Sequence, residues 1–168
     1  MGPVRTVVFV CQHGAAKSVL AAALLERLAA EHGAQLRALA RGTEPEPQVS
    51  PAVAAGLRAE GVDVAAWQPR PLTPGDLARA WRVVSFGPDL SHLVPNGIPL
   101  EGWDDVPAVT DGFQPAQVAI AGRLLRLIYW RGRGRPARAT HRRRDPHAER
   151  LHARWRSPKD GGGLETST

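Results

Sequence analysis

One short stretch constrains this chain more than any other, because four apolar residues, Val7 to Val10, lead directly into the only cysteine, Cys11. A loop of small residues follows, and then Lys17 and Ser18 open a long helical pattern. A continuous run of β-branched and aromatic residues is typical of a strand that is buried on both faces of a parallel sheet. The sequence therefore predicts a buried strand that ends in a cysteine, followed by a short loop and a helix.

The loop in this stretch predicts an anion site. Backbone N–H groups in such a loop, together with the positive end of the helix dipole, favour a bound oxyanion. The same field favours the thiolate form of a neighbouring thiol, which makes Cys11 a candidate nucleophile. A lone cysteine in an apolar run more often serves packing. Here Gly14, Ala15 and Ala16 leave room for a ligand to approach the backbone, and this favours the site.

The rest of the chain alternates helical and extended patterns. Leucines at helical spacing predict a helix over residues 18–32, and a strand is expected over residues 35–41. Further helices are expected over residues 51–60, 74–80 and 113–130, and further strands over residues 82–86 and 98–103. A first strand, helix and second strand in this order predict a right-handed βαβ unit. The whole alternation predicts a three-layer α/β sandwich with a four-stranded parallel sheet.

Two later loops carry acidic side chains. In open parallel sheets the loops after the carboxyl ends of the strands line the ligand crevice, so residues 42–51 should face the Cys11 loop. A further loop, residues 103–108, carries the adjacent carboxylates Asp104 and Asp105.

The positive charge of the chain lies at its C-terminal end. The formal net charge of +6 would suggest a nucleic-acid partner. However, residues 1–130 hold 11 Lys/Arg against 12 Asp/Glu, and residues 131–168 hold 11 against 4. We therefore expect one domain over residues 1–130 and a basic, disordered tail over residues 131–168. An arm that contacts nucleic acid or an anionic surface is the alternative for the tail.

Composition also limits the classes of function. A single cysteine excludes an intramolecular disulfide framework and is typical of a reducing compartment, so we expect a cytoplasmic protein. No apolar stretch approaches the roughly 20 residues that span a bilayer, and we expect no membrane contact. The histidines are scattered along the chain, so we expect no metal, and no cofactor is implied.

The segment Val-Cys-x5-Lys-Ser between a strand and a helix resembles the phosphate loop of the low-molecular-weight protein tyrosine phosphatases. That superfamily also contains the thiol-dependent arsenate reductases. Its members carry Cys-x5-Arg-Ser here and a general-acid Asp-Pro loop near the C-terminal end. The resemblance covers about residues 4–129, and it implies the three-layer fold already expected.

The resemblance also implies roles for individual residues. Cys11 would be the nucleophile, and Ser18 would hydrogen-bond its thiolate and ease its departure. Asp105 would protonate the leaving oxygen and then activate water, with Asp104 as the competitor for that role. The equatorial oxygens of the substrate would be cradled by the backbone N–H groups of Gln12, His13, Gly14, Ala15, Ala16 and Lys17.

Lys17 departs from the family pattern, because it keeps the charge of the family's arginine but lacks the planar fork that grips two oxygens. The acid loop also departs, since it contains Asp-Val-Pro in place of Asp-Pro. In residues 42–51, glutamates and prolines stand where the tyrosine phosphatases place an aromatic residue. The segments after Gly42 resemble the arsenate reductases more closely.

The function that the resemblance implies is hydrolysis of a phosphate monoester, with phosphotyrosine as one candidate, through a thiophosphate intermediate. The substrate would be a phosphorylated small molecule or a phosphoprotein. An arsenate reductase is the first alternative, and with one cysteine it would need an external small thiol. The second alternative is a non-catalytic module that binds an oxyanion or a phosphoprotein, which Lys17 and the altered acid loop favour.

Overall fold

The computed structural model describes residues 2–129, so the expected tail over residues 131–168 and its boundary at residue 130 lie outside the described range. The elements follow in the order β1 (Arg5–Cys11), α1 (Lys17–Glu31), β2 (Leu36–Gly42), α2 (Pro51–Ala59), α3 (Pro74–Ala78), β3 (Arg82–Phe86), β4 (Leu100–Gly102), a 3-10 helix (Val109–Asp111) and α4 (Phe113–Tyr129). The predicted alternation is confirmed. None of the helices within residues 2–129 is long and apolar enough to cross a membrane.

The predicted four-stranded parallel sheet is confirmed, and its strands lie in the order β2-β1-β3-β4. The register brings Cys11 at the end of β1 opposite Gly42 of β2 and Phe86 of β3. The carboxyl ends of three strands therefore meet at the cysteine. In a parallel sheet this is the edge at which ligands bind.

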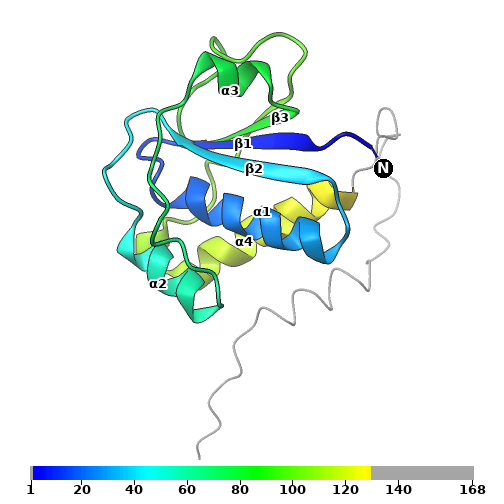
Figure 1. Cartoon of the computed structure of the whole chain (residues 1–168). Coiled ribbons are helices and arrows are strands. Elements are labelled where there is room, and N and C mark those ends of the chain that lie inside the picture. The colour runs from blue at the N-terminus through cyan, green and yellow to red at the C-terminus, as the bar shows by residue number, and fades with distance from the viewer. Residues whose placement is uncertain (1, 130–168) are drawn as a thin grey trace, which may run out of the picture. The chain divides into compact units, whose positions relative to one another are not determined.

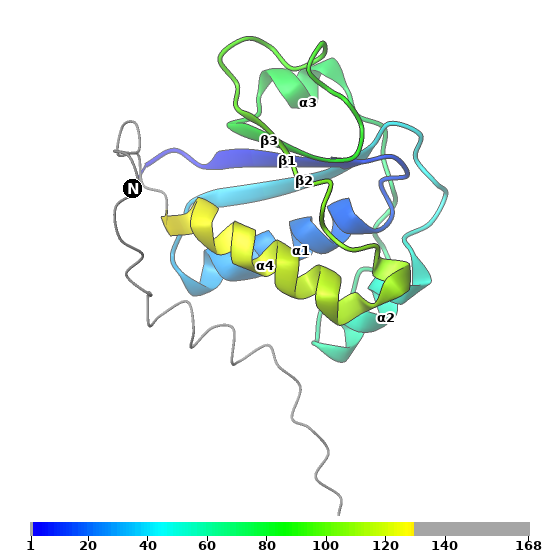
Figure 2. The ribbon, with the colours of Figure 1, turned by 180° about the vertical axis from the view of Figure 1, so that it is seen from behind.

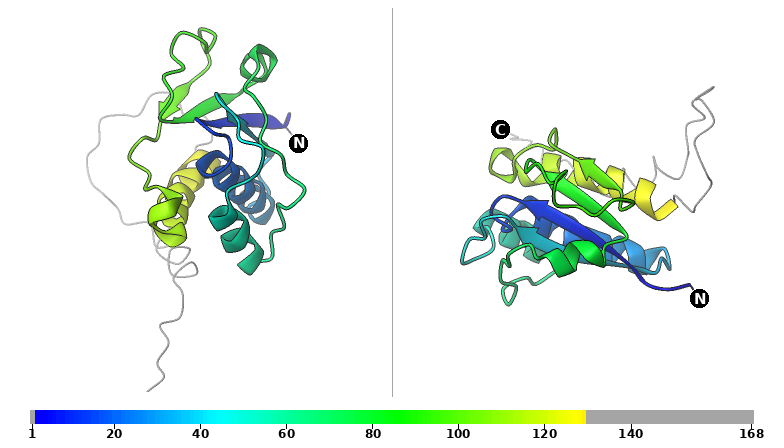
Figure 3. Two further views of the ribbon diagram at one scale, coloured as in Figure 1. Left: turned by 90° about the vertical axis from the view of Figure 1, so that its left-hand side faces the viewer. Right: turned by 90° about the horizontal axis from the view of Figure 1, so that it is seen from above.

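The sheet is covered on both faces. Helices α1, α2 and α4 lie on one face and α3 lies on the other (Figure 1), and α4 runs beside α1 when the molecule is seen from behind (Figure 2). The left-hand view in Figure 3 shows the same division into layers. Because side chains alternate across a strand, Val8 and Val10 face α3 and pack with its Leu77. Phe9 points to the opposite face, where its ring lies near those of Phe86 and Trp103.

Helix α3 is short, and polar contacts fix its position. Thr73 and Asp76 form a reciprocal capping box at its start. The Arg41 side chain at the end of β2 donates to Asp76 over 2.8 Å. Burial raises the pKa of the Asp76 carboxyl, but the hydrogen bonds from Arg41 and Thr73 outweigh it and hold that pKa below its ordinary value. The contact with α3 therefore fixes the end of β2, which lies next to Cys11.

Strand β4 is shorter than predicted, with three paired residues in place of the expected span over residues 98–103. The amide of Ile98 closes a turn on the Pro95 carbonyl, and Pro99 has no N–H to donate to the ladder. The edge strand therefore starts late, and the chain leaves it at Trp103 for the loop that carries the two carboxylates.

Candidate active site

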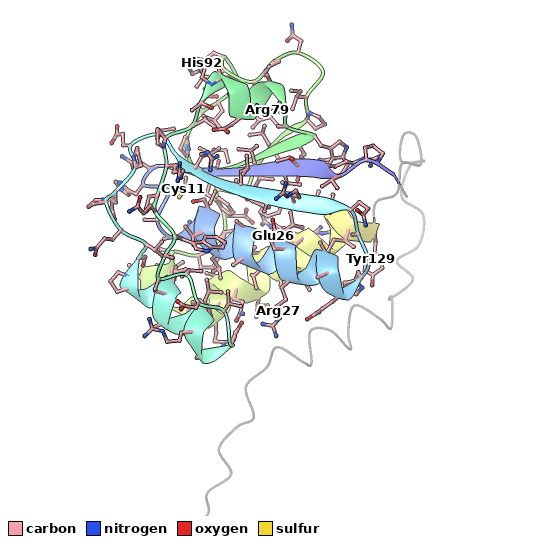
Figure 4. All side chains as sticks on the ribbon, in the orientation of Figure 1. Cys11, Glu26, Arg27, Arg79, His92 and Tyr129 are labelled. Atoms are coloured by element: carbon pink, nitrogen blue, oxygen red, sulfur yellow. The ribbon has the colours of Figure 1, made fainter. Side chains whose placement is uncertain are left out.

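The site begins with Cys11, which lies at the carboxyl end of β1, at the end of the sheet opposite Tyr129 (Figure 4). Residues 12–16 connect β1 to α1, and we call them the Cys11 loop. The thiol is largely enclosed, with 7% of the residue exposed. Residues 103–107, which follow β4, form the second loop of interest, and we call them the carboxylate loop.

The carbonyls of the Cys11 loop point away from the site. The backbone amides of Thr43, Glu44, Glu46 and Ser50 donate to the carbonyls of Cys11, Gln12, His13 and Ala15 over 2.8–3.3 Å. The expectation that residues 42–51 face this loop is therefore confirmed. Four donors from one segment, residues 43–50, hold the loop backbone in a single orientation.

The amides of the same loop are left for a ligand. Within residues 2–129, none of the backbone N–H groups of residues 12–16 donates a hydrogen bond to a protein acceptor. Helix α1 begins directly after the loop, and Ala16 provides no side-chain cap for its first N–H groups. Unpaired N–H groups at the start of a 15-residue helix are suited to an oxyanion.

Two glycines allow this loop to lie against the end of β2. Gly14 has a φ of 60°, which favours glycine, and a Cβ built on it would lie 2.8 Å from the Gly42 nitrogen. A Cβ on Gly42 would lie 2.7 Å from the Gly14 nitrogen. The close approach of the two backbones therefore excludes any side chain at either position.

Ser18 lies under the cysteine. Its hydroxyl oxygen is 3.1 Å from the Cys11 sulfur, and its side chain is fully buried in the first turn of α1. A hydroxyl at this distance can donate to a thiolate and stabilise it. This is the contact that the resemblance implies.

Two glutamates form the rim of the loop. The Gln12 amide donates to Glu44 over 3.2 Å, and the His13 ring lies 3.5 Å from the Glu46 carboxylate. About half of each of the His13 and Glu46 side chains is exposed. The side chains of Gln12 and His13 are thus engaged with the neighbouring loop, and only their backbones line the anion site.

Lys17 is directed to the carboxylate loop. Its ammonium donates to the Val106 carbonyl oxygen over 2.7 Å, across 89 positions of the sequence. The side chain of Val106 is 2% exposed, so the loop is firmly packed at this point. The positive charge that the sequence places at the anion site is therefore held by an acceptor in the protein.

The two carboxylates of this loop lie in different surroundings. Asp104 accepts a hydrogen bond from the Gly87 N–H over 2.9 Å, and Gly87 directly follows Phe86, the register partner of Cys11. Asp105 instead pairs with the Arg123 guanidinium on α4, and its side chain is 76% exposed. The hydrogen bond from Arg123 lowers the pKa of the Asp105 carboxyl.

Asp105 also opens onto a separate hollow. Together with Trp103, Arg123 and neighbouring residues it lines a groove of about 850 Å³ between β4 and α4. Cys11 is not among the described residues that line this groove. The structure therefore places Asp104 at the turn after β3, the strand next to that of Cys11, and pairs Asp105 with Arg123 on α4.

Several contacts of the site were not predicted from the sequence: those of Glu44, Glu46, Gly87, Val106 and Arg123. The glutamates stand in a segment expected to face Cys11, so their position could have indicated a rim. The part played by the Val106 carbonyl could not, because a backbone acceptor carries no residue-type signal. Within residues 2–129 no group of three or more His, Cys, Asp or Glu side chains is placed to hold a metal ion.

Comparison with known proteins adds a family and several folds. The model of the low molecular weight phosphotyrosine protein phosphatase family matches residues 6–91, about half of the chain, from β1 to just beyond β3. The carboxylate loop lies outside the matched part. No curated protein sequence matches the chain.

Solved structures with the same fold include both phosphatases and arsenate reductases. A thioredoxin-dependent arsenate reductase from Corynebacterium glutamicum is 27% identical, with a TM-score of 0.62; the alignment covers 75% of this chain but only 61% of that one. A protein tyrosine phosphatase from Entamoeba histolytica is 18% identical, with a TM-score of 0.65 and coverages of 74% and 93%. A low molecular weight phosphotyrosine phosphatase from Vibrio cholerae O395 is 15% identical, with a TM-score of 0.65 and coverages of 74% and 94%.

Proposed function

The chain belongs to the low molecular weight phosphotyrosine protein phosphatase family, and we propose that it is a cysteine-dependent phosphatase that hydrolyses a phosphate monoester. One observation carries the proposal: the Cys11 thiol lies beside a loop whose carbonyls are bound on the outer side and whose amides are unpaired. Such a loop suits the three equatorial oxygens of a phosphoryl group. In the transition state of phosphoryl transfer the negative charge is spread over these three oxygens, where the N–H groups can stabilise it.

In the proposed first step the Cys11 thiolate attacks phosphorus. A sulfur–phosphorus bond forms, and the bond from phosphorus to the leaving oxygen breaks. The backbone N–H groups of residues 12–16 and the start of α1 would hold the phosphoryl oxygens during the transfer. The product of this step is a thiophosphate on Cys11 and a free alcohol or phenol.

In the proposed second step water attacks the thiophosphate, phosphate leaves, and the Cys11 thiolate is restored. The Ser18 hydroxyl, 3.1 Å from the sulfur, would donate to the thiolate as it departs. A hydrogen bond to a charged group stabilises by about 1.5–3 kcal/mol, so Ser18 would act mainly on this step. The hydrogen bond from the Ser18 hydroxyl is strongest when the sulfur carries a full negative charge.

The proton for the leaving oxygen would come from the carboxylate loop. The sequence favoured Asp105, but the hydrogen bond of Asp104 to Gly87, beside the strand of Cys11, supports Asp104. Asp105 would first have to leave Arg123, whose hydrogen bond lowers the pKa of the Asp105 carboxyl and so opposes its protonation. We therefore propose Asp104 as the proton donor and Asp105 as its alternative.

A pre-steady-state burst assay tests this function. An aryl phosphate is mixed with the wild type and with Cys11→Ser at mildly acidic pH, and released phenol is followed from the first turnover. We expect a burst equal to the enzyme concentration in the wild type and none in Cys11→Ser. Tyr129→Phe, which removes a hydroxyl that contacts His32 at the end of the sheet opposite Cys11 (Figure 4), is the control and should keep the burst. No burst in the wild type, with phosphate still bound, would leave a module that only binds the anion.

A second candidate is arsenate reduction with an external thiol. The observation that favours it is the 27% identity to an arsenate reductase, of which this chain spans less than two thirds. That relative depends on thioredoxin, whereas this chain has one cysteine and cannot form an internal disulfide. Cys11 would attack arsenic with loss of water, and an external thiol would displace Cys11 and carry the arsenic(V) adduct away. A separate thiol reductant would then reduce it to arsenite and become a disulfide.

Arsenite production separates the two candidates. The protein is mixed with arsenate and the separate thiol reductant, with and without the small thiol. A reductase produces arsenite only when the small thiol is present. A phosphatase without reductase activity produces no arsenite in either mixture.

We also propose a cytoplasmic location, which the single cysteine supports, and a phosphorylated small molecule or a phosphoprotein as substrate.

A further inference from the structure

The contact between Lys17 and Val106 joins the two loops of the site. The Lys17 ammonium, at the first position of α1, donates to the Val106 carbonyl over 2.7 Å. We propose that Lys17 is a positioning residue that anchors the carboxylate loop to the Cys11 loop, and that it is not a ligand of the oxyanion. This inference rests on the proposed anion site.

The chemistry of lysine suits a tether of this kind. An ammonium is a compact point charge whose N–H bonds rotate freely, whereas a guanidinium presents a planar fork that matches two oxygens at once. A single carbonyl oxygen is therefore a complete partner for Lys17, and the bond is charge-assisted. The side chain is partly buried, which limits the competition of water for that bond.

The tether completes the attachment of the carboxylate loop. At its start, the Trp103 amide donates to the Ser85 carbonyl over 2.8 Å. One residue later Asp104 accepts from the Gly87 N–H. The first contact reaches β3, and the second reaches Gly87, directly after β3. Beyond Asp104 the exposed Asp105–Arg123 pair ties the loop to α4, and Lys17 ties it to α1.

The consequence concerns Asp104. With the loop fixed on β3 and on α1, the Asp104 carboxylate is held at the Gly87 N–H, directly after Phe86, the register partner of Cys11. Without Lys17, the loop beyond Asp104 would keep the buried Val106 side chain and the exposed pair of Asp105 with Arg123. Lys17 would thus act on catalysis through Asp104 and not through the phosphoryl oxygens.

The anion site does not need the ammonium for its own geometry. Its donors are the backbone N–H groups of residues 12–16, and the segment 43–50 orients them. Removing the Lys17 side chain leaves every one of those contacts in place. The positioning role and the ligand role therefore predict different results for the same variant.

Amide hydrogen exchange on the full chain tests the tether. The Val106 N–H, which donates to the Trp103 carbonyl over 3.3 Å, is the reporter, and the Val8 N–H in the middle of β1 reports global opening. In Lys17→Met we expect Val106 exchange to accelerate about tenfold while Val8 is unchanged. Arg37→Met, which removes an exposed cation from β2, is the matched control and should change neither amide.

Phosphate binding is measured on the same proteins by titration with inorganic phosphate. We expect Lys17→Met to keep its phosphate Kd within about threefold of the wild type, and to lower kcat for an aryl phosphate about tenfold with little change in KM. Unchanged Val106 exchange, or a phosphate Kd raised tenfold or more, would overturn the proposal. If the wild type binds no phosphate, the proposed function itself has failed, and the Val106 amide alone then decides whether the tether exists.

Discussion

The two loops of the site are held in different ways. The Cys11 loop is fixed through its backbone, by four amides of residues 43–50 and by the close approach of Gly14 to Gly42. The carboxylate loop is fixed largely through side chains, with Lys17 and Arg123 reaching it from two helices. Backbone contacts tolerate many substitutions of side chains, whereas a loop held by side chains depends on each of them.

The difference explains how the chain departs from the family pattern. A lysine in place of the family's arginine removes a bidentate side-chain grip, but it leaves the backbone donors of the Cys11 loop intact. The departures therefore fall on the part of the site that transfers the proton. We expect anion binding to be robust and proton transfer to be sensitive to substitution.

The largest expected effect tests the carboxylate loop. Asp104→Asn should lower kcat for an aryl phosphate about a hundredfold, because the leaving oxygen loses its proton donor. Asp105→Asn should change kcat by no more than about threefold, since that carboxylate pairs with Arg123 on the surface. Steady-state kinetics on both variants measure the difference. The reverse order of effects would return the donor role to Asp105.

A smaller effect is expected from the backbone of the Cys11 loop. Gly14→Ala should lower the free energy of unfolding by about 2 kcal/mol or more, because its positive φ strains alanine and its Cβ meets the Gly42 nitrogen. Gly33→Ala is the matched control, with a φ of 62° and no atom within 4 Å of the added Cβ. Urea unfolding gives both values, and phosphate titration should show weaker binding only in Gly14→Ala. Equal effects on stability would mean that the two backbones do not constrain each other.

The hydroxyl of Ser18 should have a smaller effect, confined to one step. Ser18→Ala should keep the burst and lower the steady-state rate about tenfold, because the departing thiolate loses a charge-assisted hydrogen bond of about 1.5 kcal/mol. Tyr129→Phe removes a hydroxyl that contacts His32 far from Cys11, and it should leave the steady-state rate unchanged. Loss of the burst in Ser18→Ala would place the hydroxyl in the first step.

The smallest expected effect is on pH dependence. The Arg123 guanidinium lowers the pKa of Asp105, so Arg123→Gln should raise that pKa toward the ordinary value for aspartate. A general acid acts in its protonated form, and activity falls as pH rises through its pKa. If Asp105 were the donor, the falling limb of the pH–rate profile would move to higher pH in Arg123→Gln. With Asp104 as the donor, we expect the limb to stay in place while carboxyl NMR shows the shift of Asp105.

The sequence predicted the regular parts of the molecule well, since strands and helices follow from local patterns. The run before Cys11 and the leucines of α1 each carry a periodicity that one segment suffices to specify. The proximity of residues 43–50 to Cys11 also followed, because parallel strands place their carboxyl ends on one edge. Strand β4 was overestimated, since a proline and a turn decide its start.

The carboxylate loop could not be predicted to the same degree. Choosing between Asp104 and Asp105 depends on Arg123, which lies on α4 and is 18 residues distant in the chain. The partner of Lys17 is a carbonyl 89 positions away, and no residue type marks it. Contacts of this kind arise from the packing of α1, α4 and β3 together, which a local pattern does not specify.

The most direct test of the account is to trap the covalent intermediate. The wild type is mixed with an aryl phosphate, quenched in acid within the first turnover and digested, and the peptide that contains Cys11 is analysed by mass spectrometry. We expect a phosphoryl group on Cys11, with accumulation increased in Ser18→Ala because breakdown is slowed. Phenol release without a phosphoryl group on Cys11 would contradict the account, and would mean that this loop binds the anion while the chemistry takes place elsewhere.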